Sequence, residues 1–460
     1  MAEAPPDPNR VLAKRLFGEA MALQKAGREV EAIASYNLSL RLHPDDTAAL
    51  HNLGILYRRS KAYAAAVACY RRVLALDPTN ANTTASLGNA LKDWGRLDEA
   101  LVWHRKALAM KPDDAGILHN LGVTLRERDE NEEALACFDR ALALEPTRGE
   151  VAWDRALALL HMGDYEQGWP AYEARWLLEE HQPPRAPLPA WDGRPAPGKG
   201  LILTTEQGFG DSIQFARFIE AARARVGRIK LAVRAPLQKL LLGVRGVDEV
   251  MDRSGPVGEA ELHLPLLTLP MVLGHRLEDL PGRIPYIAAP AQPPPAVAAA
   301  IDRVPGFRVG IVWSGSTTFK GNDKRATSLA RFLRFLEVPG VRLFSLQKGP
   351  PLKELEALKG EGLVVDLGSL IDDFAESAAT IAKLDLVIMT DSSVAHLCGA
   401  LGRPCWVLLS AAPDWRWFSG RSDSPWYPSL RLFRQKALGE WDEVFDEAVQ
   451  ALHAAAAAKK

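Results

Sequence analysis

The first third of the chain repeats one pattern of small, apolar and ring residues every 34 positions. Prolines recur at that interval, at Pro44, Pro78, Pro112 and Pro146. Two columns of small residues share the register: Ala20, Gly54, Gly88, Gly122 and Ala156, then Ala32, Ala66, Ala100, Ala134 and Gly168. A column of large rings completes it: Tyr36, Tyr70, His104, Phe138 and Tyr172. The pattern predicts stacked pairs of helices, with small residues where two helices cross and a proline closing each pair.

Four coincident columns resemble the tetratricopeptide repeat (TPR), and the resemblance implies an α-helical solenoid over residues 13–182. The predicted units are 13–46, 47–80, 81–114, 115–148 and 149–182. The fifth unit has Glu180 where the others have proline. Residues 1–12 are short, polar and proline-containing, and we expect a disordered tail there.

In the last four units a polar residue stands two positions before the first small residue, at Asn52, Ser86, Asn120 and Asp154, whereas the first unit has Gly18 there. The repeats of O-GlcNAc transferases carry an asparagine ladder in this register that grips peptide backbone. Asn52 and Asn120 match that ladder, whereas Ser86 and Asp154 depart from it. The resemblance implies a peptide-binding groove; the alternative is a row of solvated polar residues on an inner helix face.

Short apolar runs alternate with helical patterns in the rest of the chain, which is typical of an α/β fold with parallel strands. A proline-rich stretch at 183–200 predicts an extended linker, with the first strand starting at Leu201. A second proline cluster near 290–295 divides the region into 201–290 and 300–455.

Two strand-to-helix turns carry candidate chemistry. The first contains Gly208, Gly210 and Asp211, where glycine permits close approach of another group to the backbone. The second contains Asp391, Ser392 and Ser393 before a short helix. Free N–H groups at such a helix start favour a phosphate or diphosphate, although an ordinary capped helix has the same residues. Asp211 is either a chemical group or the cap of a helix starting near Ser212.

The second turn, Asp-Ser-Ser-Val-Ala-His-Leu followed by Gly-Ala-Leu-Gly-Arg-Pro, resembles the donor-binding motif of bacterial heptosyltransferases and related GT-B glycosyltransferases. The resemblance implies two Rossmann-like halves with a cleft between them. It makes Asp211 the general base and Asp391 the contact to donor sugar hydroxyls. Ser392 and Ser393 would hold the diphosphate, with His396 either facing the same cleft or packed.

A cationic segment after the strand at 308–313 contains Lys320 and Arg325. Heptosyltransferases place a lysine after this strand to neutralise the leaving diphosphate. By position Lys320 is the first candidate and Arg325 the second; the alternative for both is a solvated basic loop. We found no Asp-x-Asp motif in a metal-binding context, so the sequence predicts a metal-independent reaction without a cofactor beyond the nucleotide-sugar co-substrate.

Composition and charge limit the classes of partner and the cellular compartment that we expect. The formal net charge of −1 gives no overall attraction to nucleic acid. Four scattered cysteines without a C-x-x-C pair suit a reducing compartment. No signal-peptide pattern and no run of apolar residues long enough to span a membrane is present, so we expect a cytoplasmic protein.

The combination resembles bacterial repeat-containing transferases that glycosylate proteins such as flagellin. It implies transfer of a sugar from a nucleotide sugar to a Ser or Thr hydroxyl of a protein that the repeat groove recruits. Two alternatives remain open. One is an inactive scaffold for protein assembly, and the other is a transferase acting on a lipid or polysaccharide.

Overall fold

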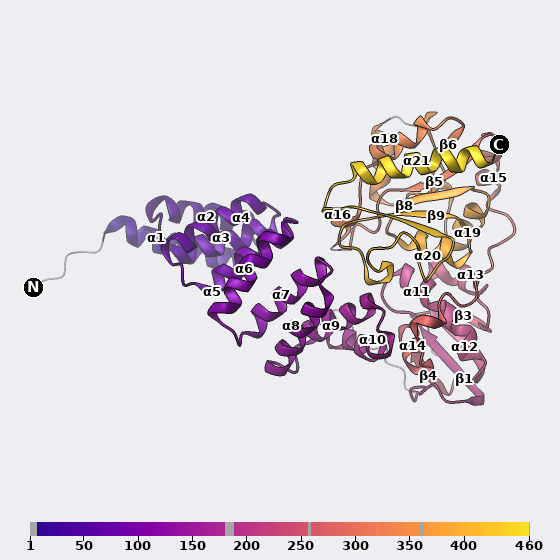
Figure 1. Ribbon diagram of the computed structural model, residues 1–460, viewed down its shortest axis with the longest axis horizontal. Helices are drawn as coiled ribbons and strands as arrows, with labels where there is room; N and C mark the ends of the chain where they lie inside the picture. The colour runs from indigo at the N-terminus through magenta and orange to yellow at the C-terminus, as the bar shows by residue number, and fades with distance from the viewer. Residues whose placement is uncertain (1–6, 180–187, 256–258, 320, 359–361, 460) are drawn as a thin grey trace, which may run out of the picture. The chain divides into compact units, whose positions relative to one another are not determined.

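The computed structural model describes residues 7–179, 188–255, 259–319, 321–358 and 362–459. The chain divides into two compact units, Met1–Ala158 and Leu159–Lys460. The first unit is α-helical and the second is α/β, which confirms the predicted fold class (Figure 1).

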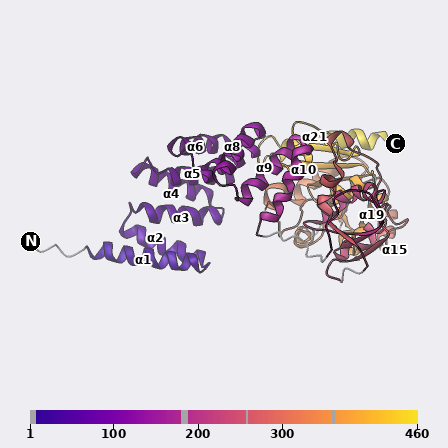
Figure 2. The same ribbon diagram turned by 90° about the horizontal axis from the view of Figure 1, so that it is seen from below.

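Antiparallel helix pairs follow one another through the first unit, and Figure 2 shows them stacked in sequence order. The helices are α1 (Pro8–Lys25), α2 (Glu29–Leu42), α3 (Thr47–Arg59), α4 (Tyr63–Leu76), α5 (Ala81–Asp93), α6 (Leu97–Met110), α7 (Ala115–Glu127) and α8 (Asn131–Leu144). α9 (Gly149–Met162) runs across the boundary between the units. Asp46, Asn80 and Asp114 cap the starts of α3, α5 and α7, as their side chains accept backbone N–H groups.

The first column of small residues lies against the rings of the partner helices. A Cβ atom placed on Gly54 would lie 2.6 Å from the Tyr70 ring, and one on Gly122 would lie 2.5 Å from the Phe138 ring. Such contacts exclude any larger residue. At the start of the chain, α1 begins at Pro8, inside the segment 1–12 predicted to be disordered, and the Asp7 side chain caps it by accepting the Asn9 N–H.

The second unit contains two parallel sheets. The first has the order β3-β2-β1-β4, from β1 (Ala196–Thr204), β2 (Val226–Val233), β3 (Glu249–Asp252) and β4 (Leu262–Pro265). Its helices are α10 (Tyr165–Tyr172), α11 (Phe209–Phe215), α12 (Ile219–Arg223), α13 (Gln238–Leu241) and α14 (Leu269–Leu273). The sequence placed the start of β1 at Leu201 and a linker up to residue 200. β1 instead starts at Ala196, which pairs with Val226 of β2.

The second sheet has the order β10-β9-β8-β5-β6-β7. Its strands are β5 (Phe307–Val312), β6 (Val341–Ser345), β7 (Val364–Asp366), β8 (Leu386–Thr390), β9 (Cys405–Leu409) and β10 (Leu430–Arg434). Its helices are α15 (Pro295–Asp302), α16 (Asn322–Arg325), α17 (Leu329–Phe332), α18 (Lys353–Ala357), α19 (Phe374–Ala382), α20 (Ser393–Ala400) and α21 (Asp442–Ala458). The last helix, yellow in Figure 1, covers one face of this sheet and buries Phe445 and Leu452 in its core.

Among the helices that the structure describes, none combines the length and the apolar character needed to cross a membrane.

Candidate functional site

The site centres on the contact between α11 of the first sheet and α20 of the second. Each helix follows the carboxyl end of a central parallel strand, β1 or β8. The helices touch at Gly210, where an added Cβ would lie 2.8 Å from His396 Cδ2 and 3.4 Å from Ser393 Cα. Only glycine permits this approach. The two turns singled out in the sequence therefore meet, although about 180 residues separate them.

Asp211 uses both of its carboxylate oxygens. Oδ2 accepts the Gly208 N–H at 2.8 Å, which makes Asp211 the third residue of α11 and a cap of its start. α11 begins at Phe209, so the expected start near Ser212 was wrong, because this contact organises an earlier turn. Oδ1 forms an ion pair with Arg416, from the 3₁₀ helix Trp415–Trp417 that follows β9.

Arg416 joins the two halves of the second unit. Its side chain is buried, bonds the Gln214 side chain on α11, and pairs with Asp414 at 2.9 Å. Burial by itself lowers the pKa of Arg416, but the negative charges of Asp414 and Asp211 outweigh burial, so the pKa is raised. The sequence analysis assigned no role to Arg416. Its only signal was one arginine inside an aromatic run, whereas its partner Asp211 lies 205 residues away in the chain.

Asp391 lies at the end of β8 and pairs with Arg325, with 3.5 Å between Oδ2 and Nη1. Burial raises the pKa of Asp391 in spite of the opposing Arg325 charge. Arg325 ends α16 and also covers the Phe319 ring, with 4.3 Å from Cζ to the ring centroid. The structure thus brings these two predicted residues together. Lys320, the first choice for the cationic role, lies outside the described residues.

The helix start at Ser392 is built as the sequence suggested. Ser392 is the N-cap of α20 and its side chain accepts the Val394 N–H at 3.4 Å, while Ser393 is the first helical residue. His396 is packed: its ring stacks on Trp417 with centroids 5.4 Å apart, and Nδ1 bonds the Tyr427 hydroxyl at 3.1 Å. Burial lowers the pKa of His396 to about 3, so the ring is neutral at physiological pH.

A buried amide holds the loop after β5 beside this helix start. Gln347 Oε1 accepts the N–H groups of Trp313 and Ser314 at 3.1 and 3.0 Å. Asn322 donates to the Ser314 hydroxyl at 3.0 Å and accepts the Gly315 N–H at 3.1 Å. These bonds hold residues 313–315 in the absence of a ligand. Among the described residues, no group of three or more His, Cys, Asp or Glu side chains is arranged to hold a metal ion.

The polar row of the repeats belongs to the first unit. Asn52 and Asn120 are half-buried on α3 and α7. Asp154 is engaged with other side chains, since it accepts from His119 at 2.8 Å and pairs with Arg126 at 3.0 Å. At this position the carboxylate is thus held by two neighbouring side chains.

Family models identify the helical region. The tetratricopeptide repeat matches residues 47–80 and 115–148, and a TPR repeat model matches residues 88–126. The first unit is a TPR array. A curated relative, Protein FlbA of Caulobacter vibrioides, is 30% identical over an alignment of 339 residues, and the match covers 65% of this chain. The chain spans about half of that relative's length, 54%.

Solved structures similar to part of the chain include MamA and two proteins described as TPR proteins. MamA is 19% identical, with 34% of this chain and 91% of that chain covered and a TM-score of 0.31. YrrB, described as a TPR protein with an unusual peptide-binding site, is 18% identical over 36% and 86% of the two chains, with a TM-score of 0.31. A thermophilic TPR protein of Thermus thermophilus, TTC0263, is 21% identical over 37% and 93%, with a TM-score of 0.33.

Proposed function

We propose that the second unit is a metal-independent glycosyltransferase of the GT-B type, which moves a sugar from a nucleotide sugar to a hydroxyl group of a protein. The observation that carries the proposal is the contact of Gly210 with Ser393 and His396. It joins the loops at the carboxyl ends of two parallel sheets, which is where α/β folds bind their ligands. A donor site on one half and an acceptor site on the other would face each other there.

The donor would lie against the second sheet. The N-terminus of α20, with Ser392 and Ser393, offers N–H groups and hydroxyls to a diphosphate. Arg325 supplies a positive charge 3.5 Å from Asp391, so the guanidinium could exchange its carboxylate partner for the leaving diphosphate. Asp391 is then free to accept hydrogen bonds from sugar hydroxyls. Lys320 remains a further candidate for the same charge.

Asp211 would act as the general base. The acceptor oxygen forms a bond to the anomeric carbon and gives its proton to the carboxylate, while the bond to the diphosphate breaks and the electron pair leaves with it. In the structure Asp211 is held by Gly208 and Arg416, which fix the orientation of the carboxylate. Each carboxylate oxygen has a second lone pair, so the acceptor hydroxyl can approach Asp211 while these contacts are kept.

The repeats would recruit the protein acceptor, with Asn52 and Asn120 among the groups that contact its backbone. TPR arrays offer concave surfaces suited to protein partners, which supports this part of the proposal. We place the reaction in the cytoplasm, where nucleotide sugars are made.

Calorimetric titration with UDP, GDP, CDP, ADP and TDP tests the donor site. We expect one nucleotide to bind, its Kd to rise at least tenfold in Arg325→Gln, and its Kd to stay within twofold in Arg331→Gln. Arg331 is the matched control because it pairs with Asp442 on the outside of the same half. Absence of binding to all five nucleotides would refute the donor site.

Transfer itself is tested with a labelled nucleotide sugar and protein extract from source cells that lack this protein. We expect label on protein, transfer that persists in EDTA, and no transfer by Asp211→Asn with nucleotide binding unchanged. Turnover preserved in that variant would remove Asp211 as the base.

A second candidate function is an assembly scaffold without turnover. The engagement of both Asp211 oxygens favours it, because a purely structural ion pair would look the same. A nucleotide-free protein that still captures partners through its repeats would support the scaffold. Label on lipid or polysaccharide in the transfer assay would instead point to a different acceptor.

A further inference from the structure

The loop Thr205–Gly208 connects β1 to the helix that carries Asp211, and its backbone needs external support. Gln207 has φ +58°, in the left-handed region that residues other than glycine rarely adopt. Such conformations persist only where surrounding contacts hold them. The position of Asp211 therefore depends on the groups that fix this loop.

Part of the support comes from the first sheet itself. Thr205 N and Oγ1 both donate to the Ala232 carbonyl, at 3.0 and 3.1 Å. Arg234 donates to the Gln207 carbonyl at 2.8 Å, and Arg253 donates to the Thr205 carbonyl at 3.3 Å. These bonds hold the backbone of the loop but leave the side chains of Glu206 and Gln207 to other partners.

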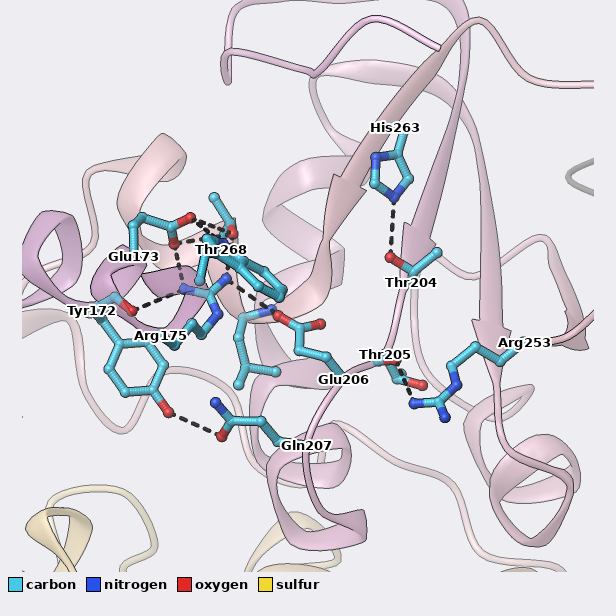
Figure 3. A network of polar contacts seen from close by, with 12 residues as sticks. Tyr172, Glu173, Arg175, Thr204, Thr205, Glu206, Gln207, Arg253, His263 and Thr268 are labelled. Carbon is cyan, nitrogen blue, oxygen red and sulfur yellow. Dashed lines mark hydrogen bonds and ion pairs between the residues drawn. The ribbon is translucent and has the colours of Figure 1, made fainter. Parts of the chain in front are cut away.

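Glu206 Oε1 accepts the Leu267 N–H at 3.3 Å, and the other partners come from α10 and the 3₁₀ helix Glu173–Leu177 that follows it (Figure 3). The Tyr172 hydroxyl donates to Gln207 Oε1 at 3.2 Å. Arg175 Nη2 bonds Glu206 Oε1 at 3.3 Å. Together the two contacts hold the side chains of consecutive loop residues from outside the sheet.

Arg175 is the centre of this network and is fully buried. Besides Glu206, it pairs with Glu173 at 2.6 Å and donates to the Thr268 hydroxyl at 2.7 Å. One guanidinium thus serves two carboxylates. Burial outweighs the Arg175 charge and raises the pKa of Glu206 to about 7, so Glu206 depends on Arg175 whenever it is ionised.

We propose that Tyr172 and Arg175 are positioning residues of the candidate transferase site, which hold the Glu206–Gln207 loop and through it orient Asp211. The segment 165–177, which the repeat pattern assigns to the fifth helix pair, is then a working part of the transferase unit. The inference rests on the proposed function for its catalytic consequence, but its structural part can be tested alone.

The structural readout is amide hydrogen exchange at Gly208, whose N–H is bonded to Asp211 Oδ2. We expect exchange at least tenfold faster than wild type in Arg175→Met and several-fold faster in Tyr172→Phe, which keeps the ring. Arg175→Lys should remain close to the methionine variant, because lysine lacks the planar fork that bonds the Tyr172 carbonyl, Glu173, Glu206 and Thr268.

Arg276→Met is the matched control. Arg276 also pairs with α10, at Glu166, but that pair is exposed and 3.9 Å apart. Exchange at Gly208 should stay within twofold of wild type in this variant. Equal exchange in Arg276→Met, Tyr172→Phe and a folded Arg175→Met would overturn the proposal. Should Arg175→Met fail to fold, unchanged exchange in Tyr172→Phe alone would overturn it.

The catalytic readout separates this proposal from the proposed function. In an active protein we expect Tyr172→Phe to lower kcat about tenfold, with the nucleoside diphosphate Kd within twofold, because the donor groups lie on the other half. A kcat equal to that of wild type would refute the positioning role. If the wild-type protein transfers no sugar, the proposed function fails while the exchange measurements still decide whether the segment holds the loop.

Discussion

Replacing His104 by phenylalanine should make the repeat unit less sensitive to acid. His104 occupies the ring column where Tyr36, Tyr70 and Phe138 stand in other repeats, and its side chain is fully buried. Neither ring nitrogen has a hydrogen-bond partner among the residues that the structure describes. Burial lowers the pKa of His104 from 6.5 to about 3, with a smaller contribution in the same direction from Lys92.

The direction of the pH dependence follows from the number of protons that the folded and the unfolded chain bind. Below pH 6.5 the unfolded chain binds a proton at His104, whereas the folded chain binds none until the pH approaches 3. The free energy of unfolding therefore falls as the pH is lowered through this window. The loss is about 1 kcal/mol at pH 6 and about 2 kcal/mol at pH 5. Phenylalanine has no proton to bind, so the loss disappears.

Scanning calorimetry of the full chain at pH 7.5 and pH 5.0 provides the measurement. For a unit of this size a difference of about 2 kcal/mol corresponds to about 4 to 8 °C in Tm. We expect the acid-induced fall in Tm of the repeat transition to shrink by that amount in His104→Phe. At pH 7.5 the variant should also be more stable by about 1 kcal/mol or more, because two unsatisfied buried nitrogens are removed.

The reverse substitution supplies the control. Phe138 stands in the equivalent position of the next repeat and packs on Gly122 as His104 packs on Gly88. Phe138→His should introduce a second acid-sensitive site of similar size. Equal acid-induced shifts in wild type and His104→Phe, or a His104 resonance that titrates near pH 6.5, would refute the reasoning.

Three further predictions concern packing and charge. Gly399→Ala should destabilise the second unit by several kcal/mol, because the added Cβ would lie 2.2 Å from the Tyr427 ring. Gly18 faces open space, so Gly18→Ala should instead stabilise α1 by up to about 1 kcal/mol. Similar Tm shifts in the two variants would contradict this. Arg416→Met should cost about 3 to 5 kcal/mol in denaturant unfolding, since two carboxylates lose their cation, and a cost below about 1 kcal/mol would show the pair to be dispensable. Because burial raises the pKa of Glu206 from 4.5 to about 7, the free energy of unfolding should fall by about 3 kcal/mol as the pH rises from below 4.5 towards 7. Glu206→Gln should flatten the pH dependence of unfolding in that range. An unchanged profile would contradict the raised pKa of Glu206.

The turns at Gly208–Asp211 and Asp391–Ser393 could be found in the sequence because each follows a buried strand and carries turn and cap residues in a short stretch. The residues that contact these turns in the folded protein could not be found in the sequence. Arg416 lies 205 residues from Asp211, and no local pattern distinguishes an arginine that bonds a distant carboxylate from one that faces water. The sequence analysis did not find the contact between Glu206 and Arg175 for the same reason, although only 31 residues separate them.

The sequence by itself determined the TPR array and the change from an α-helical to an α/β region. Both depend on local periodicity: each repeat contacts its neighbours, and each buried strand is a short apolar run between turns. Only the tertiary structure decided which charges meet. It brought Gly210 against α20, placed Arg416 between the two halves, and gave α10 and the residues after it to the second unit. These contacts arise from the packing of whole sheets and helices, and the free energy of a buried ion pair depends on where that packing puts its partner rather than on the neighbours in the chain.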